Sequence, residues 1–180
     1  KDGVLNGHIV IIGGGDPTLG SGRIAGNPDL QALMQAYVDA VKNAGIRTIH
    51  GAIAGEDTRY GTAAVPSAWL WMDIGNYYGA GAYGLNIAEN QFNILLQPGS
   101  TIGDGVTMLG CNPEVPGLEI HNELTTAAAG TGDNAYIYGA PYTGLCYARG
   151  TIPSSKSVFK VKASLPDPAL FAAEQLKKAL

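Results

Sequence analysis

Glycine is the sequence feature that most constrains the fold, because the chain has 26 glycines and 10 prolines among its 180 residues. One residue in five is therefore a turn-former, against about 12% in an average protein. Such a composition favours many short strands joined by tight turns over a helical bundle. Hydrophobic residues make up 46% of the chain, which is enough for a packed core and excludes a disordered chain.

The charge pattern limits the classes of partner. Charged residues are only 14% of the chain, and the formal net charge is -4. Binding of phosphate backbones needs a basic face, so a nucleic-acid partner is not expected. No run approaches the roughly 18 apolar residues that a membrane-spanning helix needs. We therefore expect no membrane span in this segment.

The first sixty residues predict a strand, a helix and a second strand. The apolar run 8–12 predicts a buried strand, which ends at three consecutive glycines. Asn27 and Pro28 are suited to open a helix, as N-cap and first helical residue. The run 48–53 predicts the second strand. A strand-helix-strand unit is a crossover, so the two strands are expected to be parallel.

The remaining segments predict mainly antiparallel sheets followed by a last helix. Residues 86–88 and 92–96 are interpreted as the two strands of a hairpin. Four further strands, spaced as in an antiparallel meander, are predicted at 118–124, 135–138, 147–152 and 158–161. Asp167 and Pro168 open the helix, with Leu170, Ala173, Leu176 and Leu180 expected on its buried face. The predicted fold class is α+β: mainly antiparallel sheets, a strand-helix-strand unit near the N-terminus and a C-terminal helix.

Motifs for cofactors and metals are weak. Residues 20–25 fit the G-x-G-x-x-A pattern, but they lie past the strand and before the helix cap, so tight turns are the favoured use of these glycines. The histidines have no metal-ligand spacing, and the aspartates fall in predicted turns, where Asp is common. No cofactor and no metal are expected; the residues weighed were His8, His50, His121, Asp16, Asp57, Asp73, Asp104 and Asp133.

Nucleophile motifs are also weak. Ser157 and Lys160 fit Ser-x-x-Lys, but that chemistry needs both residues on one face of a helix, whereas residues 157–162 alternate like a strand. The match is interpreted as accidental. Cys111 and Cys146 are the only cysteines, and they are equally compatible with a disulfide and with two small buried hydrophobic residues.

The segment from Trp69 to Asp73, followed by Tyr77 and Tyr78, has two interpretations. The first is core aromatics with a surface Asp. The second is a carboxylate beside aromatic walls, which binds an ammonium group through charge and cation–π attraction.

The order of the motifs along the chain resembles that of the class C low-molecular-mass penicillin-binding proteins, which are D-alanyl-D-alanine carboxypeptidases/endopeptidases. The residues that carry the resemblance run over essentially the whole chain: 13–19, 45–51, 57–60, 69–73, 78–80, 85–86, 89–90 and 167–173. In that family a long insertion separates the Ser-x-x-Lys helix of the catalytic domain from its Ser-x-Asn element. The resemblance implies that this chain is that insertion plus the first returning helix, which agrees with a start that lacks Met and a last helix without a C-cap.

By this resemblance, residues 1–60 form a strand-helix-strand lobe, 61–165 form a β lobe and 166–180 return to the catalytic domain. The chain alone is then non-catalytic, while its parent is a serine-type peptidase of the periplasm or cell envelope. The resemblance assigns Asp73 and Tyr78 to the pocket for the amino group of the peptidoglycan stem peptide, with Trp69 and Trp71 as supports. Met72 stands where family members often carry a polar or acidic residue.

The implied partners are the stem peptide and the catalytic domain of the same polypeptide. Two alternatives remain at this point. One is a stand-alone envelope binding or interaction module related to the insertion. The other is an enzyme that uses aspartates around Asp16 and Asp57.

Overall fold

A computed structural model describes residues 2–180 and divides into two compact units. Unit 1 contains the residues up to Ala64, Ala82–Glu89 and Asp167–Leu180, and unit 2 contains Val65–Gly81 and Asn90–Pro166. Neither unit is one continuous stretch of sequence. The division into segments 1–60, 61–165 and 166–180 stays a prediction about the organisation of the parent protein.

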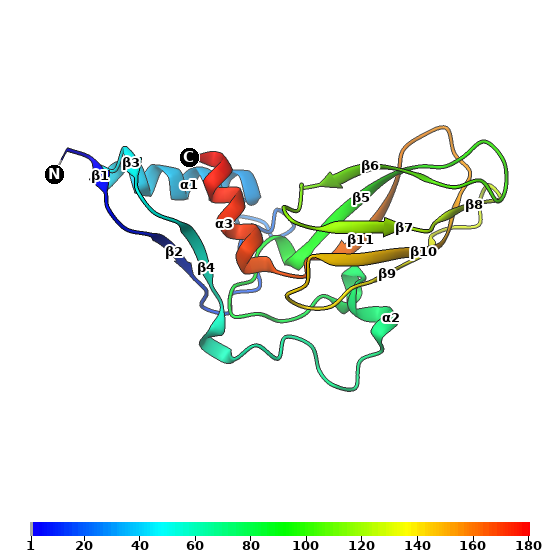
Figure 1. The fold of residues 1–180 in the computed structure, drawn as a ribbon, viewed down its shortest axis with the longest axis horizontal. Coiled ribbons are helices and arrows are strands. Elements are labelled where there is room, and N and C mark those ends of the chain that lie inside the picture. Colours follow the sequence, from blue (N-terminus) through cyan, green and yellow to red (C-terminus); the bar gives the residue numbers. More distant parts are fainter. Residues whose placement is uncertain (1) are drawn as a thin grey trace. The chain divides into compact units, whose positions relative to one another are not determined.

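Unit 1 is built on two strand pairs that form one interrupted parallel ribbon (Figure 1). Its strands are β1 (Val4–Leu5), β2 (Ile9–Ile12), β3 (Thr48–Ile49) and β4 (Ile53–Glu56). Val4 pairs with Thr48 and Ile12 with Glu56, so the register offset is 44 residues throughout. The predicted parallel crossover is confirmed, although the second strand is two strands, and β2 is half-exposed rather than buried.

The crossover helix is α1 (Leu30–Asn43), and it begins two residues after Pro28, the predicted first helical residue. Asp29 is the N-cap, and its Oδ1 accepts a hydrogen bond from the Ala32 amide at 2.9 Å. The predicted N-cap, Asn27, is therefore wrong: a carboxylate caps a helix as well as an amide does, and the helix begins after Asp29. Leu33, Met34 and Val38 are buried, at the spacing that places them on one face of the helix.

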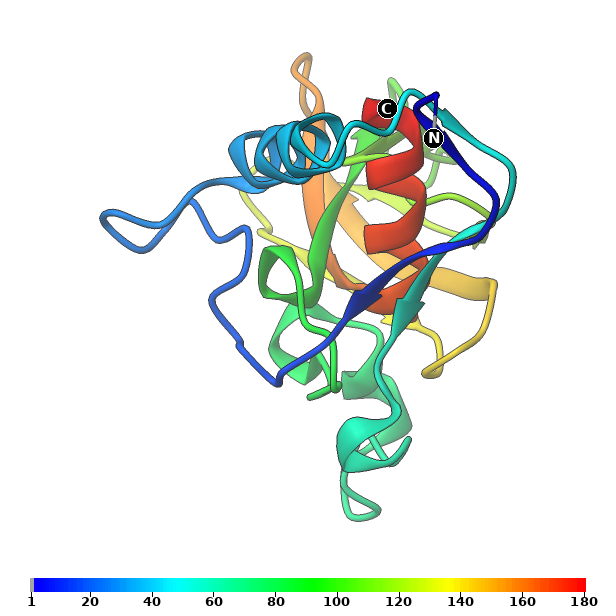
Figure 2. The same cartoon turned by 90° about the vertical axis from the view of Figure 1, so that its left-hand side faces the viewer.

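The last helix, α3 (Pro168–Ala179), has Asp167 as its N-cap and packs against α1, β2 and β4 (Figure 2). Ala173 and Leu176 are buried, as predicted, but Leu170 and Leu180 are exposed. Phe171 and Ala172 are buried instead. Because α3 packs against both a helix and a strand pair, its apolar face is wider than a single row of residues along the helix.

Unit 2 contains two sheets. In the first, β5 (Gln91–Gln97) lies between β6 (Thr107–Asn112) and β11 (Phe159–Ser164), and both pairings are antiparallel. In the second, β10 (Leu145–Pro153) pairs in parallel with β7 (Glu119–Asn122) and β8 (Thr125–Ala127), and antiparallel with β9 (Asn134–Tyr138). Phe92, Ile94 and Leu96 alternate on the buried face of β5.

The short helices are η1 (Thr58–Tyr60), α2 (Trp71–Ile74), η2 (Tyr77–Gly79) and η3 (Ala88–Asn90). No helix of residues 2–180 is long and apolar enough to cross a membrane. Both cysteines are free thiols; Cys146 is buried and Cys111 is half-buried.

The α+β class is confirmed, and the longest strand pairings are antiparallel. The predicted hairpin at 86–96 is wrong, because Ala88, Glu89 and Asn90 all have positive φ and form a left-handed turn instead of a strand end. The predicted meander is wrong as well, since β11 pairs with β5 rather than with β10. Alternation within a strand predicts its existence but not which strand lies beside it.

Helix α3 offers a matched test of this packing. Leu176→Ala should lower the free energy of unfolding by about 2–5 kcal/mol, because it leaves a cavity in the core. Leu180→Ala removes the same atoms from an exposed site and should change it by less than about 0.5 kcal/mol. Urea unfolding followed by far-UV circular dichroism measures both; equal effects would contradict the packing described for α3.

Candidate functional site

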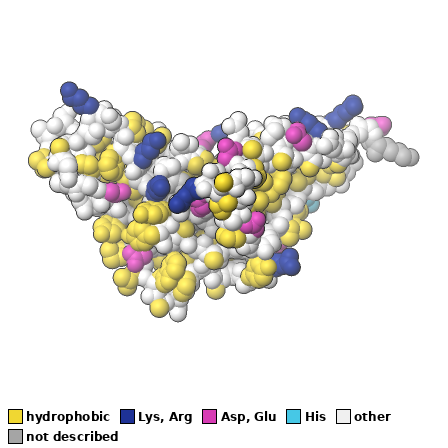
Figure 3. All heavy atoms as spheres, turned by 180° about the vertical axis from the view of Figure 1, so that it is seen from behind, with side chains coloured by type: hydrophobic (Ala, Val, Ile, Leu, Met, Phe, Trp, Pro, Cys, Tyr) yellow, Lys and Arg dark blue, Asp and Glu magenta, His cyan; other side chains and the backbone are white. Residues whose placement is uncertain are grey.

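The four residues assigned by resemblance lie within one short segment of unit 2. Trp69 precedes α2, Trp71 and Asp73 belong to α2, and Tyr78 belongs to η2. The two indoles and the Tyr78 phenol are 42–57% exposed, and Asp73 is half-buried. The interpretation as core aromatics is therefore wrong. Figure 3 shows hydrophobic side chains gathered where unit 2 carries α2.

The Tyr78 phenol lies within the electrostatic influence of the Asp73 carboxylate. Partial burial is the largest cause that raises the pKa of Tyr78, and the negative charge of Asp73 is the next. The phenol is therefore protonated and neutral at neutral pH. Among residues 2–180 no ion pair involves Asp73, so no cation of the described residues neutralises its charge.

Aromatic rings of the same segment contact one another and a neighbouring strand. Trp71 meets Tyr138 of β9 edge to face at 5.2 Å between centroids, and Tyr77 meets Tyr78 in the same way at 5.3 Å. The Lys162 ammonium lies 5.6 Å over the Tyr77 ring. One ring of the cluster thus already holds a cation against its face, which is the geometry of a cation–π contact.

The buried Asn76 side chain fixes the segment to the sheet. Its Nδ2 donates to the Met72 carbonyl at 2.6 Å, and its Oδ1 accepts from the Ile137 amide of β9 at 3.0 Å. Ser164 of β11 adds a second attachment, because its Oγ donates to the Ile74 carbonyl at 2.7 Å. These bonds hold α2 against both β9 and β11.

Two glycines permit this close packing. A Cβ on Gly75 would run into the Ile137 carbonyl, and one on Gly79 would run into the Asp73 carbonyl. In both cases the obstacle is backbone, which cannot rotate away as a side chain could. The α2–η2 segment can therefore fold over Asp73 only with glycine at these positions.

Sequence reasoning missed Asn76, Ser164 and Tyr138. Tyr138 and Ser164 are distant from α2 in sequence, and they contact it from positions on β9 and β11. Asn76 lies three residues after Asp73, in a segment with no clear period, where Asn also occurs as a turn residue. A single sequence contains no signal that separates such a buried Asn from a turn Asn.

The outer face of β7, β10 and β9 continues from Tyr138. Arg149 lies 5.5 Å from the Tyr138 centroid and 4.9 Å from that of Tyr147, and it forms a 2.8 Å ion pair with Glu123. His121 stacks on Tyr147. Glu123 neutralises Arg149 on this face. Arg149 and His121 already lie against the Tyr138 and Tyr147 rings.

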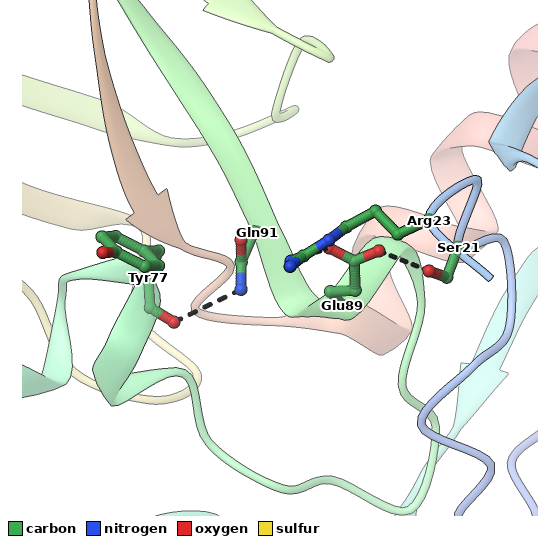
Figure 4. Close-up of polar contacts among 5 residues, drawn as sticks. All are labelled: Ser21, Arg23, Tyr77, Glu89 and Gln91. Carbon is green, nitrogen blue, oxygen red and sulfur yellow. Dashed lines mark hydrogen bonds and ion pairs between the residues drawn. The ribbon is translucent and has the colours of Figure 1, made fainter.

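Residues 20–25 of unit 1 are not arranged as a phosphate-binding loop. Ser21 Oγ donates to the Glu89 carboxylate, and Arg23 Nη1 lies 3.1 Å from Glu89 Oε2 (Figure 4). The carboxylate occupies the donors that a phosphate would need and would repel one. Helix α1 begins only at Leu30, so its N-terminus is not at these glycines. This agrees with the interpretation of the glycines as turn residues.

The other nucleophile and metal candidates have no site around them. Ser157 lies in an exposed bend, and Lys160 lies on β11 with its side chain exposed, so the two are not on one helical face. Burial raises the pKa of Cys146 to about 12, which disfavours the thiolate at neutral pH. Within residues 2–180, no three His, Cys, Asp or Glu side chains are grouped as metal ligands would be.

The comparisons with known proteins point to one family. The sequence model of the D-Ala-D-Ala carboxypeptidase 3 (S13) family matches residues 1–180. A D-alanyl-D-alanine carboxypeptidase of Actinomadura sp. (strain R39) is 25% identical over an alignment 185 residues long, which covers 96% of this chain and 31% of that protein. The chain therefore spans about a third of the length of the curated relative it matches.

Solved structures with the same fold are found in Haemophilus influenzae. Penicillin-binding protein 4 superposes with a TM-score of 0.72 at 16% identity and covers 99% of this chain and 37% of that one. The same protein in complex with a novel β-lactam superposes with a TM-score of 0.63 at 15% identity, over 100% of this chain and 34% of that one. At these identities the likeness shows the fold.

Asn76→Ala tests the attachment of α2. It should lower the free energy of unfolding by about 1–3 kcal/mol, because the Ile137 amide loses its partner in a buried position. Asn134→Ala removes an exposed amide and should change it by less than about 0.5 kcal/mol. Denaturant unfolding followed by tryptophan fluorescence reports on unit 2, which contains Trp69 and Trp71. A silent Asn76→Ala would mean that this amide does not hold the segment.

Proposed function

Because the chain belongs to the D-Ala-D-Ala carboxypeptidase 3 (S13) family, we propose that it is the inserted, non-catalytic region of a serine-type D-Ala-D-Ala carboxypeptidase/endopeptidase. The parent would act on peptidoglycan stem peptides in the periplasm or cell envelope. The insertion would contribute the α2–η2 segment to the pocket for the stem-peptide amino group. The observation that carries this assignment is the half-buried Asp73 carboxylate, which has no ion-pair partner among the described residues and lies in a segment of exposed aromatic rings.

The chemistry of the pair suits a primary ammonium. A half-buried carboxylate that no cation neutralises gains a charge-assisted hydrogen bond when an ammonium arrives. A bound peptide that covers the exposed rings would exclude water and lower the local dielectric, which strengthens that contact. The rings also attract a cation directly, as the position of Lys162 over Tyr77 illustrates.

The structure around Ser157 bears on which part of the parent contains the catalytic serine. A serine nucleophile needs a base within hydrogen-bond reach, and the family places its Lys one helical turn after the Ser. Ser157 and Lys160 lie on a bend and a strand instead. We therefore place the catalytic serine of the parent outside residues 1–180. Asp73 and Tyr78 would bind and orient the substrate rather than take part in the bond cleavage.

Asp73→Asn in the full-length parent tests the pocket. Loss of a charge-assisted contact worth about 1.5–3 kcal/mol predicts a fall of roughly 10- to 150-fold in kcat/KM for a stem peptide with a free side-chain amine. The same peptide with that amine acetylated should show little change between the two proteins. Asp133→Asn, at an exposed turn, is the matched control and should behave as wild type. Equal losses on both peptides would exclude Asp73 from amine recognition.

A labelled β-lactam tests the position of the nucleophile. Serine-type enzymes of this kind acylate on their catalytic serine, so the full-length parent should gain one label that peptide mapping assigns outside residues 1–180. Ser157→Ala should leave the labelling rate unchanged. A label on Ser157, or no label on the parent at all, would contradict the proposed role; the second outcome would favour a stand-alone binding module.

A further inference from the structure

Unit 1 has an apolar strip on the outer face of its parallel ribbon. The strip is defined here as Val10 and Ile12 of β2 together with Ala54 of β4, which pairs with Val10. Val10 is 49% exposed and Ile12 is 71% exposed, while Ile9 and Ile11 point to the other face and are half-buried. Both alternating positions of β2 therefore carry apolar side chains.

The other face of the ribbon is already covered. Helix α3 contacts β2 and β4, and Figure 2 looks onto the two strands from the side opposite α3. Parallel sheets are almost always covered on both faces, and strands covered in this way are apolar at every position rather than at alternate ones. The sequence of β2, Ile-Val-Ile-Ile, has that two-sided pattern.

The ribbon is also narrower than a self-sufficient sheet. Among the described residues β2 and β4 pair only with each other, so each strand has a free edge. A two-stranded sheet is marginal on its own and is normally completed by further strands or by packing. Exposed edges next to an apolar face favour association with more polypeptide.

We propose that this strip is the surface on which the remaining part of the same polypeptide packs, with apolar side chains over Val10 and Ile12. The proposal rests on the proposed function insofar as that function makes the chain part of a longer parent. The length of the relatives supports it, because this chain covers only 31% of one relative and 37% of the matched solved structure.

The size of the strip favours the same polypeptide over a second copy of the chain. A stable interface between separate molecules buries about 800 Å² on each partner, because it must offset the loss of translational and rotational freedom. A segment tethered to the strip avoids most of that cost, since its effective concentration is high. Two exposed side chains and a small neighbour are therefore enough for packing within one chain.

Cysteine labelling of the full-length parent tests the proposal. Ile12→Cys should react with a maleimide about tenfold or more slowly than Ile102→Cys, because a covered side chain reacts only after local opening. Ile102 is the matched control, since it is 72% exposed and lies in unit 2. Peptide mapping separates these labels from any on Cys111 and Cys146. Equal labelling rates would overturn the proposal.

Two further measurements complete the test. Val10→Cys repeats the experiment at the adjoining position, and hydroxyl-radical footprinting of the unsubstituted parent compares oxidation of Ile12 and Ile102 without any substitution. Protection that disappears on dilution would identify a second copy as the occupant and would also overturn the proposal. None of these readouts uses peptidase activity, so a failure of the Asp73 assignment leaves this result interpretable.

Discussion

The candidate site depends on one buried amide. Asn76 is 3% exposed, and it joins the Met72 carbonyl to the Ile137 amide of β9. Helix α2 is a single turn, too short to be stable without such attachments. The position of α2 relative to β9 is therefore set by the sheet, through Asn76, and not by the helix itself.

The carboxylates of the chain differ in what they are paired with, and that difference gives Asp73 its character. Glu89 and Glu123 form ion pairs with arginines, whereas no ion pair involves Asp73 among residues 2–180. An arginine neutralises a carboxylate, but the neutral Tyr78 phenol leaves the charge of Asp73 available to a further cation.

Local chemistry explains what could be predicted from the residues. The periodic Leu33 and Met34 of α1 and the Asp167–Pro168 start of α3 depend on contacts within one or two turns, so they are visible in sequence. The cap of α1 was placed at Asn27 instead of Asp29, because both residue types cap helices and lie two positions apart. The hairpin at 86–96 was mispredicted because its central residues adopt left-handed angles that are stabilised from elsewhere in the chain. Glu89, for example, is held by Ser21 and Arg23.

The sequence by itself determined the family, the α+β class, the parallel crossover and the segment that contains Asp73 and Tyr78. These depend on residue order and on contacts between near neighbours. Only the tertiary structure decided that Trp69 and Trp71 are exposed, that Tyr138 and Ser164 reach α2, and that β2 has an uncovered apolar face. Burial and strand pairing join residues far apart in sequence, and alternation along a strand does not state which neighbour each face will meet.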